Sequence, residues 1–360
     1  MRLFGTEKLP KGPSFRSARL ICKDLGCSSL EFKAPAPRPA FGGRWEEEPG
    51  SVDLNSPARF ELAETWDKKV IEGMRWQRLY SNNWRFNGFP IIQPRVGYLS
   101  CFVDVHAVDG LPINESLFDF SVLANQVLTN RELCIYARTE EGYTEAALDV
   151  NPDLWPDVLG PVNSQWLNKH GNDWLYIEEQ QLTDTAYAIN WISPITHQHY
   201  VCFRFVIRRY SIEGPNAYRI EERVRPDTFL DLMHQIMDSV KLELCEEMKV
   251  ERDRIRTIEP SERRPVIEFT PEQLKVAKHV LYMSSFRKPE DGDDRWSSGM
   301  ERLAPSEEVE AFLDERVKFK PLPGSYPRGG IIYNRVPVQP ITKLVDSLPQ
   351  GAIARKAIPE

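Results

Sequence analysis

The chain has 360 residues, of which 41% are hydrophobic and 28% are charged, and its formal net charge is −7. Nine tryptophans and this apolar fraction suffice for a buried core, which excludes a fully disordered chain. Acidic and basic residues are interspersed, so we expect no concentrated positive surface, and nucleic acid is not an expected partner.

The cysteine pattern favours a reduced compartment. Six cysteines are scattered along the chain: Cys22, Cys27, Cys101, Cys134, Cys202 and Cys245. Three of the six lie in apolar runs typical of buried strands, where a free cysteine behaves as a small hydrophobic residue. Residues 1–15 lack the apolar stretch of ~7 to 15 residues of a secretory signal, and no run approaches the ~18 residues that span a bilayer. We therefore expect a cytoplasmic protein with no membrane partner.

The chain divides into three predicted parts. Residues 1–57 contain Pro and Gly at intervals that interrupt helices, which predicts an extended Pro-rich arm or, equally, a disordered linker. Residues 58–250 carry the regular apolar patterns of a core domain. Residues 251–360 alternate charged stretches with short amphipathic helices and form a predicted C-terminal extension.

The first half of the core domain begins with four apolar residues spaced by four, which predict a helix: Leu62, Trp66, Val70 and Met74. Residues 74–92 then predict a hairpin with Trp76 and Trp84 on its arms and a turn at 81–83. Residues 97–108 predict a strand. Residues 116–130 fit a helix or a short buried strand, and the helix is favoured. Residues 150–163 predict a loop, followed by a turn that ends at Gly171.

Three strand-like runs follow, at 173–182, 185–194 and 199–210, and polar or Pro-containing turns between them predict an antiparallel meander. Alternate residues of the third run are nearly all apolar and mark its core face: His199, Val201, Phe203, Phe205 and Ile207. Residues 225–244 predict a helix capped by Asp227 or Thr228, with an apolar stripe. A helix packed on a half-buried antiparallel sheet predicts an α+β fold.

His197 and His199 point the same way on the third predicted strand, about 6 to 7 Å apart. A metal site needs three or four ligands, and this face continues without a carboxylate; cupin-type sheets place a Glu where this chain has Arg204 or Phe205. A polar rim is therefore the favoured interpretation. No metal, and no cofactor of any other kind, is expected.

The C-terminal extension contains three predicted short helices. The first begins with a capping box at Thr270 and Gln273, the second follows Ser306, and the third starts at Ile341. Helices this short are marginal alone in water, so they need a surface to lie on. That surface is either the protein's own core or a partner.

Motifs typical of active sites are not found, among them the nucleophile elbow, the phosphate-binding loop and the zinc-protease helix. We therefore predict no catalytic residues. Aromatic residues of the meander form a candidate binding surface for a peptide or helix if their faces coincide: Trp174, Tyr176, Tyr187, Trp191 and Tyr200. The alternative is that they are core residues or cross-strand pairs.

Residues 172–244 resemble the MOG1/PsbP-like α/β fold through "WLYIEE", "YAINWISP", "HYVCFRFVI" and a helix that ends "IMDSVKLEL". The resemblance covers about a fifth of the chain. Proteins of this fold are mostly binding modules, adaptors, secretion-effector chaperones or subunits of assemblies, so the resemblance implies a role without catalysis. The arms at 1–57 and 251–360 depart from the compact family pattern.

The expected function is a non-enzymatic protein-binding or assembly module, an α+β core whose arms wrap a protein partner or a second copy of the chain. The first alternative is a hydrolase-type enzyme with a site near His197 and His199. The second is an immunity-type protein that neutralises a toxin, which is a special case of protein binding.

Overall fold

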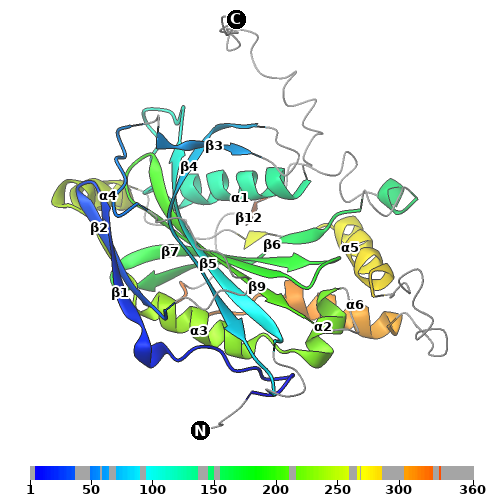
Figure 1. Cartoon of the computed structure of the whole chain (residues 1–360). Helices are drawn as coiled ribbons and strands as arrows, with labels where there is room; N and C mark the ends of the chain where they lie inside the picture. Colours follow the sequence, from blue (N-terminus) through cyan, green and yellow to red (C-terminus); the bar gives the residue numbers. More distant parts are fainter. Residues whose placement is uncertain are drawn as a thin grey trace, which may run out of the picture.

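A computed structural model describes residues 5–36, 49–56, 59–64, 70–89, 95–136, 145–149, 155–210, 216–258, 266–267, 269–285, 304–326 and 332–333. It shows a strongly twisted central sheet with helices on both faces, which confirms the predicted α+β class (Figure 1). None of the described helices is long and apolar enough to cross a membrane.

The central sheet has the strand order β3-β4-β5-β9-β8-β7-β6, and every neighbouring pair is antiparallel. Its strands are β3 (Glu61–Glu64), β4 (Val70–Phe86), β5 (Gly97–Val108), β6 (Val158–Lys169), β7 (Asn172–Gln181), β8 (Tyr187–Pro194) and β9 (His199–Arg209). The predicted strand at 97–108 and the predicted meander are confirmed as β5 and as β7, β8 and β9. The meander therefore forms the centre and one side of a larger sheet.

Each face of the sheet carries a helix (Figure 1). The face that we call the α3 face is covered by α3 (Asp227–Asp238), as predicted from its apolar stripe, and the stripe residues are all buried in one cluster with the strands: Phe229, Met233, Ile236, Met237 and Val240. The opposite face, the α1 face, carries α1 (Phe120–Tyr136), which confirms the favoured prediction for residues 116–130. Neither Asp227 nor Thr228 is the N-cap of α3, a position that Pro226 occupies without a side-chain hydrogen bond.

A second sheet from the N-terminal region extends the cover of the α3 face. It has the order β1-β2-β10, with β1 (Arg19–Leu25), β2 (Ser28–Ala34) and β10 (Lys241–Glu243). Leu25, Leu30 and Phe32 are fully buried in the cluster that also holds the stripe of α3. The division of the chain at residue 57 stays a prediction, but this hairpin shares its core with the central sheet.

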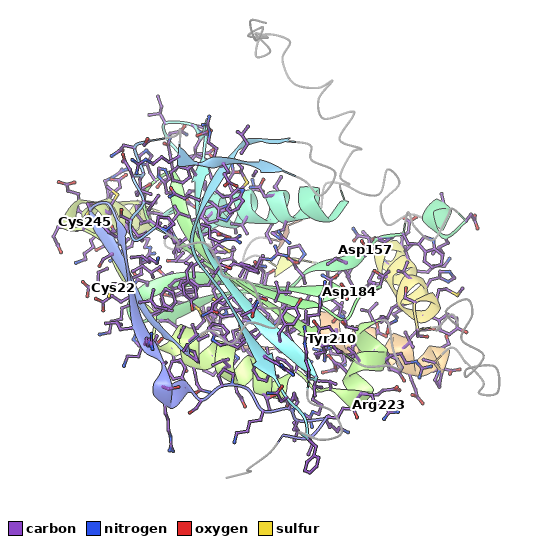
Figure 2. All side chains as sticks on the ribbon, viewed as in Figure 1. Cys22, Asp157, Asp184, Tyr210, Arg223 and Cys245 are labelled. Carbon is purple, nitrogen blue, oxygen red and sulfur yellow. A yellow bond between two sulfur atoms is a disulfide. The ribbon has the colours of Figure 1, made fainter. Side chains whose placement is uncertain are left out.

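Cys27 and Cys245 form a disulfide that joins the β1-β2 turn to the segment after β10. Figure 2 marks Cys245 at the end of the hairpin whose first strand carries Cys22, an exposed free thiol. Sequence reasoning treated the cysteines as free thiols and did not foresee this bond, because its partners are 218 positions apart. Only the fold brings them together.

The helix and hairpin predicted for residues 60–92 are wrong. This region forms β3 and the single long strand β4, with a register shift between Arg78 and Tyr80. A spacing of four positions is also a multiple of the strand period of two, so the apolar residues could not distinguish the two structures. The expected turn at 81–83 lies inside β4, where Asn82 donates a hydrogen bond to the Tyr80 hydroxyl at 2.8 Å.

The loop predicted for 150–163 is wrong from residue 158 onward, and the turn predicted from a Ser164 cap does not begin there, because residues 158–169 form β6; residues 150–154 lie outside the described part of the chain. Pro161 and the polar residues around it indicated a loop, but β6 lies at the end of the sheet, where a Pro is tolerated. The turn itself is at His170 and Gly171, both with positive φ, which suits the tight hairpin between β6 and β7.

The C-terminal region packs beside β6. The capping box of Thr270 and Gln273 is confirmed at the start of α5 (Pro271–Met283), and the second predicted helix is α6 (Ser306–Val317). Both bury apolar residues with Leu159 of β6 and with Tyr218 of α2 (Ala217–Arg223). The helix predicted from Ile341 lies outside the described residues. The surface that α5 and α6 need is therefore supplied by this chain.

The remaining described elements are the charged helix α4 (Glu246–Ile258), two short 3-10 turns at Phe15–Ser17 and Glu145–Leu148, and a parallel pair of two-residue strands, β11 (Val266–Ile267) and β12 (Ile332–Tyr333). After α6 the chain runs along β6: the Leu322 amide donates to Gln165 Oε1 at 2.9 Å, and Tyr326 donates to the Trp166 carbonyl at 2.9 Å. Residues 318–326 thus cover the outer edge of β6.

Candidate functional site

The α1 face of the sheet holds the candidate site. On β9 the apolar set predicted as the core face does point to the α3 face, from Val201 to Ile207. The residues between them, Tyr200, Cys202 and Arg204, point to the α1 face and line a cavity of about 340 Å³. Strands β4, β5, β8 and β9 form its floor, and the second half of α1 forms one wall.

Charged side chains line this cavity. Among the described residues around it, three are cations and one is an anion: Arg78, Arg131, Arg204 and Asp104. Register explains why they meet, since Arg78 of β4 lies opposite Asp104 of β5, and Cys202 of β9 lies opposite Asp104 on its other side. The side chains of Arg78 and Arg204 are 35% and 33% exposed, so the cavity reaches solvent there.

Arg78 is held rigidly. Its Nε donates to Asp104 Oδ1 at 2.7 Å and its Nη2 to Oδ2 at 3.2 Å, the two-point geometry that makes Arg–carboxylate pairs strong. Its guanidinium also lies over the rings of Trp76 and Phe102, at 5.0 and 4.5 Å from their centroids. Burial raises the pKa of the Asp104 carboxyl, and the bond and charge of Arg78 offset this only in part.

Glu179 of β7 lies at the base of the charged cluster and is 1% exposed. It forms ion pairs with Arg131 of α1 and with Arg204 of β9, the latter at 3.5 Å, and Asn190 Nδ2 donates to it at 3.3 Å. Burial alone would raise the pKa of this carboxyl. The charges of Arg131 and Arg204, with hydrogen bonds from Arg131 and Asn190, outweigh burial and hold the pKa below its usual value.

Asn130 and His106, which both line the cavity, each have a buried polar atom with no hydrogen-bond partner among the described residues. One is Nδ2 of Asn130, a residue of α1 that is 9% exposed; the other is Nδ1 of His106. The His106 ring stacks on Tyr200 with centroids 4.7 Å apart. Burial, helped by the charges of Arg131, Arg78 and Arg204, lowers the pKa of His106 to about 3, so the imidazole is neutral at physiological pH.

The cavity groups are poorly suited to acid–base or nucleophilic catalysis. Burial raises the pKa of the Cys202 thiol to about 12, so it is no thiolate nucleophile at neutral pH. A histidine of pKa about 3 is a weak base, and among the described side chains no hydrogen bond joins it to Asp104, which is committed to Arg78. The arrangement suits recognition of a bound molecule.

The aromatic residues proposed as a binding surface are not brought onto one exposed face. Four of them are buried on the α3 face, with exposures of 1 to 7%: Trp174, Tyr176, Tyr187 and Trp191. Tyr200 is on the α1 face, where it lines the cavity. Tyr176 and Trp191 form an edge-to-face pair across neighbouring strands, which is the packing role considered as the alternative.

His197 and His199 do not form a metal site with their described neighbours. His197 is exposed, whereas His199 Nδ1 is 2.8 Å from Thr196 Oγ1 and its ring lies beside Phe60. Within the described part of the chain, no three His, Cys, Asp or Glu side chains are grouped to hold a metal ion. A hydrolase-type site near these histidines stays an untested alternative.

Sequence reasoning missed Arg78, Asp104, His106, Arg131 and Glu179. The available signal was the presence of charged residues at alternate positions of otherwise apolar strands, as at Asp104 in "SCFVDVHAV". A charged residue in a strand is more often solvated, so the pattern alone could not separate a buried cluster from an exposed face.

Comparison of this chain with models of protein families, with curated proteins and with solved structures gives no match.

Proposed function

We propose that this is a non-catalytic binding protein that holds a small organic molecule in the cavity beside α1. The observation that carries the proposal is the cavity itself: about 340 Å³, with apolar, aromatic and charged side chains in its wall and with polar atoms of Asn130 and His106 that have no partner among the described residues. Ligand pockets are typically ~300 to 1,000 Å³, mostly apolar, with a few placed polar groups.

The geometry of the wall supports a preformed site. Arg78 is fixed by Asp104 and two rings, and Glu179 fixes the side chains of Arg131 and Arg204. Groups held in this way lose little conformational freedom when a ligand binds, which favours affinity.

A cavity-filling variant tests the proposal. Val127 of α1 lines the cavity, so Val127→Phe should place its ring there, and fragments that bind the wild type in ligand-observed NMR should no longer bind. Val250→Phe is the control, because Val250 is 67% exposed on α4. This variant should bind the same fragments as the wild type does. The proposal would be contradicted if the fragments bound Val127→Phe and Val250→Phe equally, or if no fragment bound the wild type.

A second candidate function is the protein-binding or assembly role expected from the sequence. The helices α5 and α6 need no partner to lie on, since both pack on this chain's own core. An observation that favours it is Ile113, which is fully exposed and lines a surface hollow with Glu251, Arg254 and Ile255 of α4. An exposed large apolar residue beside a hollow is a feature of interaction surfaces.

Light scattering over a range of protein concentrations tests the self-association form of this candidate. Mass that rises with concentration for the wild type and stays at that of one chain for Ile113→Asp would support an interface at this hollow. A wild type that stays at 41.6 kDa throughout would argue against self-association.

A further inference from the structure

Among the described residues, the charges around the cavity do not cancel. Asp104 neutralises Arg78 through the two-point contact, and the single carboxylate of Glu179 serves both Arg131 and Arg204. Counting these five groups leaves one positive charge in excess. Glu61 of β3 lies close enough to act on Asp104 electrostatically, but it is exposed and does not line the cavity.

The excess charge is carried by a side chain with donors to spare. The Arg204 side chain forms one ion pair among the described residues, from Nη2 to Glu179 Oε2 at 3.5 Å. A guanidinium has five N–H donors in a planar fork, so this pair leaves most of them available. Arg78, by contrast, is committed to Asp104. Arg204 is therefore the side chain best placed to receive an anion.

Asn130 adds a second donor on the α1 side of the cavity. Its amide nitrogen is buried and unpartnered among the described residues, and the side chain faces the same cavity as Arg204. A neutral amide donor beside a guanidinium suits the two oxygens of a carboxylate, each of which accepts hydrogen bonds.

His106 reports the same field from within the cavity. The positive charges of Arg131, Arg78 and Arg204 all act on its ring and disfavour its protonation. An anion bound among these arginines would reduce that effect and favour the protonated imidazolium. Binding should therefore be accompanied by a rise in the pKa of His106, a signature that a purely apolar ligand would not produce.

Resting on the proposed function, we infer that the ligand is a small organic carboxylate whose carboxyl group is held by Arg204 and Asn130 and whose apolar or aromatic body lies against Val127, Ile192 and Tyr200. A monoanion matches the single excess charge. A phosphate dianion would exceed it and face repulsion from the nearby Asp104 carboxylate.

Matched acid and amide probes test this inference. Benzoate and benzamide have the same ring and nearly the same shape, and hexanoate and hexanamide repeat the comparison with an aliphatic body. Calorimetric titration of the full chain should give binding of the acids that is at least about 10-fold tighter than that of the amides, since hydrogen bonds to a charged group are stronger than those to a neutral one. Phenyl phosphate and inorganic phosphate should bind more weakly than benzoate.

Two variants localise the carboxyl group. Arg204→Gln should weaken benzoate binding about 10- to 100-fold and leave benzamide unchanged. Asn130→Asp, which puts a carboxylate beside the proposed one, should do the same if Arg204→Gln proves unstable. Arg208→Gln is the matched control: Arg208 is on the same strand but pairs with the exposed Asp184, and this variant should bind benzoate as the wild type does.

The outcomes separate this inference from the proposed function. Equal binding of acids and amides that Val127→Phe abolishes would overturn the carboxylate and leave the cavity as a ligand site. Tighter binding of phosphates than of benzoate, or benzoate binding that survives Arg204→Gln and Asn130→Asp, would also overturn it. Failure of both acids at millimolar concentrations overturns the carboxylate, while the fragment set with Val127→Phe judges the proposed function independently.

Discussion

The two faces of the central sheet are built from the same strands but differ in kind. The α3 face is closed by a helix and a hairpin over a continuous cluster of large apolar residues, most of them fully buried. The α1 face is apolar where Phe120 and Leu123 pack on the strands, and charged where Arg131 of α1 meets Glu179 and Arg204 of the sheet. Alternation along the strands thus gives the sheet one face that is apolar throughout and one that is partly charged.

A cavity-creating substitution on the α3 face should have the largest effect on stability. Met233 of α3 is fully buried, so Met233→Ala should lower the free energy of unfolding by about 2–5 kcal/mol, measured in urea. Benzoate affinity at a temperature where the variant is folded should not change. A parallel loss of affinity would show that the two faces are coupled.

The second variant removes the carboxylate beneath the charged cluster of the α1 face. Glu179→Ala leaves Arg131 and Arg204 without their shared partner and should cost about 3 kcal/mol, the low end for a broken buried pair, because both arginines are partly exposed. Asp184→Ala breaks the exposed pair with Arg208 and should cost no more than about 1 kcal/mol (Figure 2 marks Asp184). Equal effects of the two variants in urea unfolding would mean that the cluster is solvated.

The disulfide concerns the α3 face, because the β1-β2 hairpin that it holds in place packs on that face. Cys27→Ser should reduce the free energy of unfolding in non-reducing buffer by at least about 2 kcal/mol, since a cross-link over a long loop restricts the unfolded chain. Cys22→Ser removes an exposed free thiol and should have no effect. In reducing buffer, the wild type and Cys27→Ser should have the same free energy of unfolding. A difference that persists in reducing buffer would contradict the disulfide.

The last expected effect concerns two histidines on opposite faces of the sheet. Burial lowers the pKa of His106 to about 3 and that of His199 to about 4, from an ordinary value of 6.5. Because only the unfolded state takes up these protons below pH 6.5, stability should fall as the pH falls, by about 1.4 kcal/mol per pH unit for each histidine, down to its folded pKa.

Comparison of His106→Phe and His199→Phe with the wild type at pH 7 and pH 5 separates the two contributions. Each variant should show a shallower pH dependence of unfolding than the wild type. Saturating benzoate should reduce the pH dependence attributable to His106 and not that attributable to His199. Equal responses of the two histidines to benzoate would place the anion elsewhere.

Much of the fold could be predicted because its signals are local. The strand at 97–108, the meander, α3 and the capping box of α5 are all confirmed, and each depends on periodicity or hydrogen bonds within a few residues. The predictions for 60–92 and 150–171 were wrong where a local pattern fits two structures. There, pairing with distant strands decided the outcome, as for β4 with β5 and β6 with β7.

By itself, then, the sequence determined that this chain forms an α+β core with an apolar face on β9 and helices whose stripes require cover. Tertiary structure alone decided that Arg78 meets Asp104 across two strands, that Arg131 of a helix shares Glu179 with Arg204, and that α5 and α6 find their surface on this chain. The physical reason is that the energy of a charge depends on its burial and its neighbours in space, which local order along the chain does not encode.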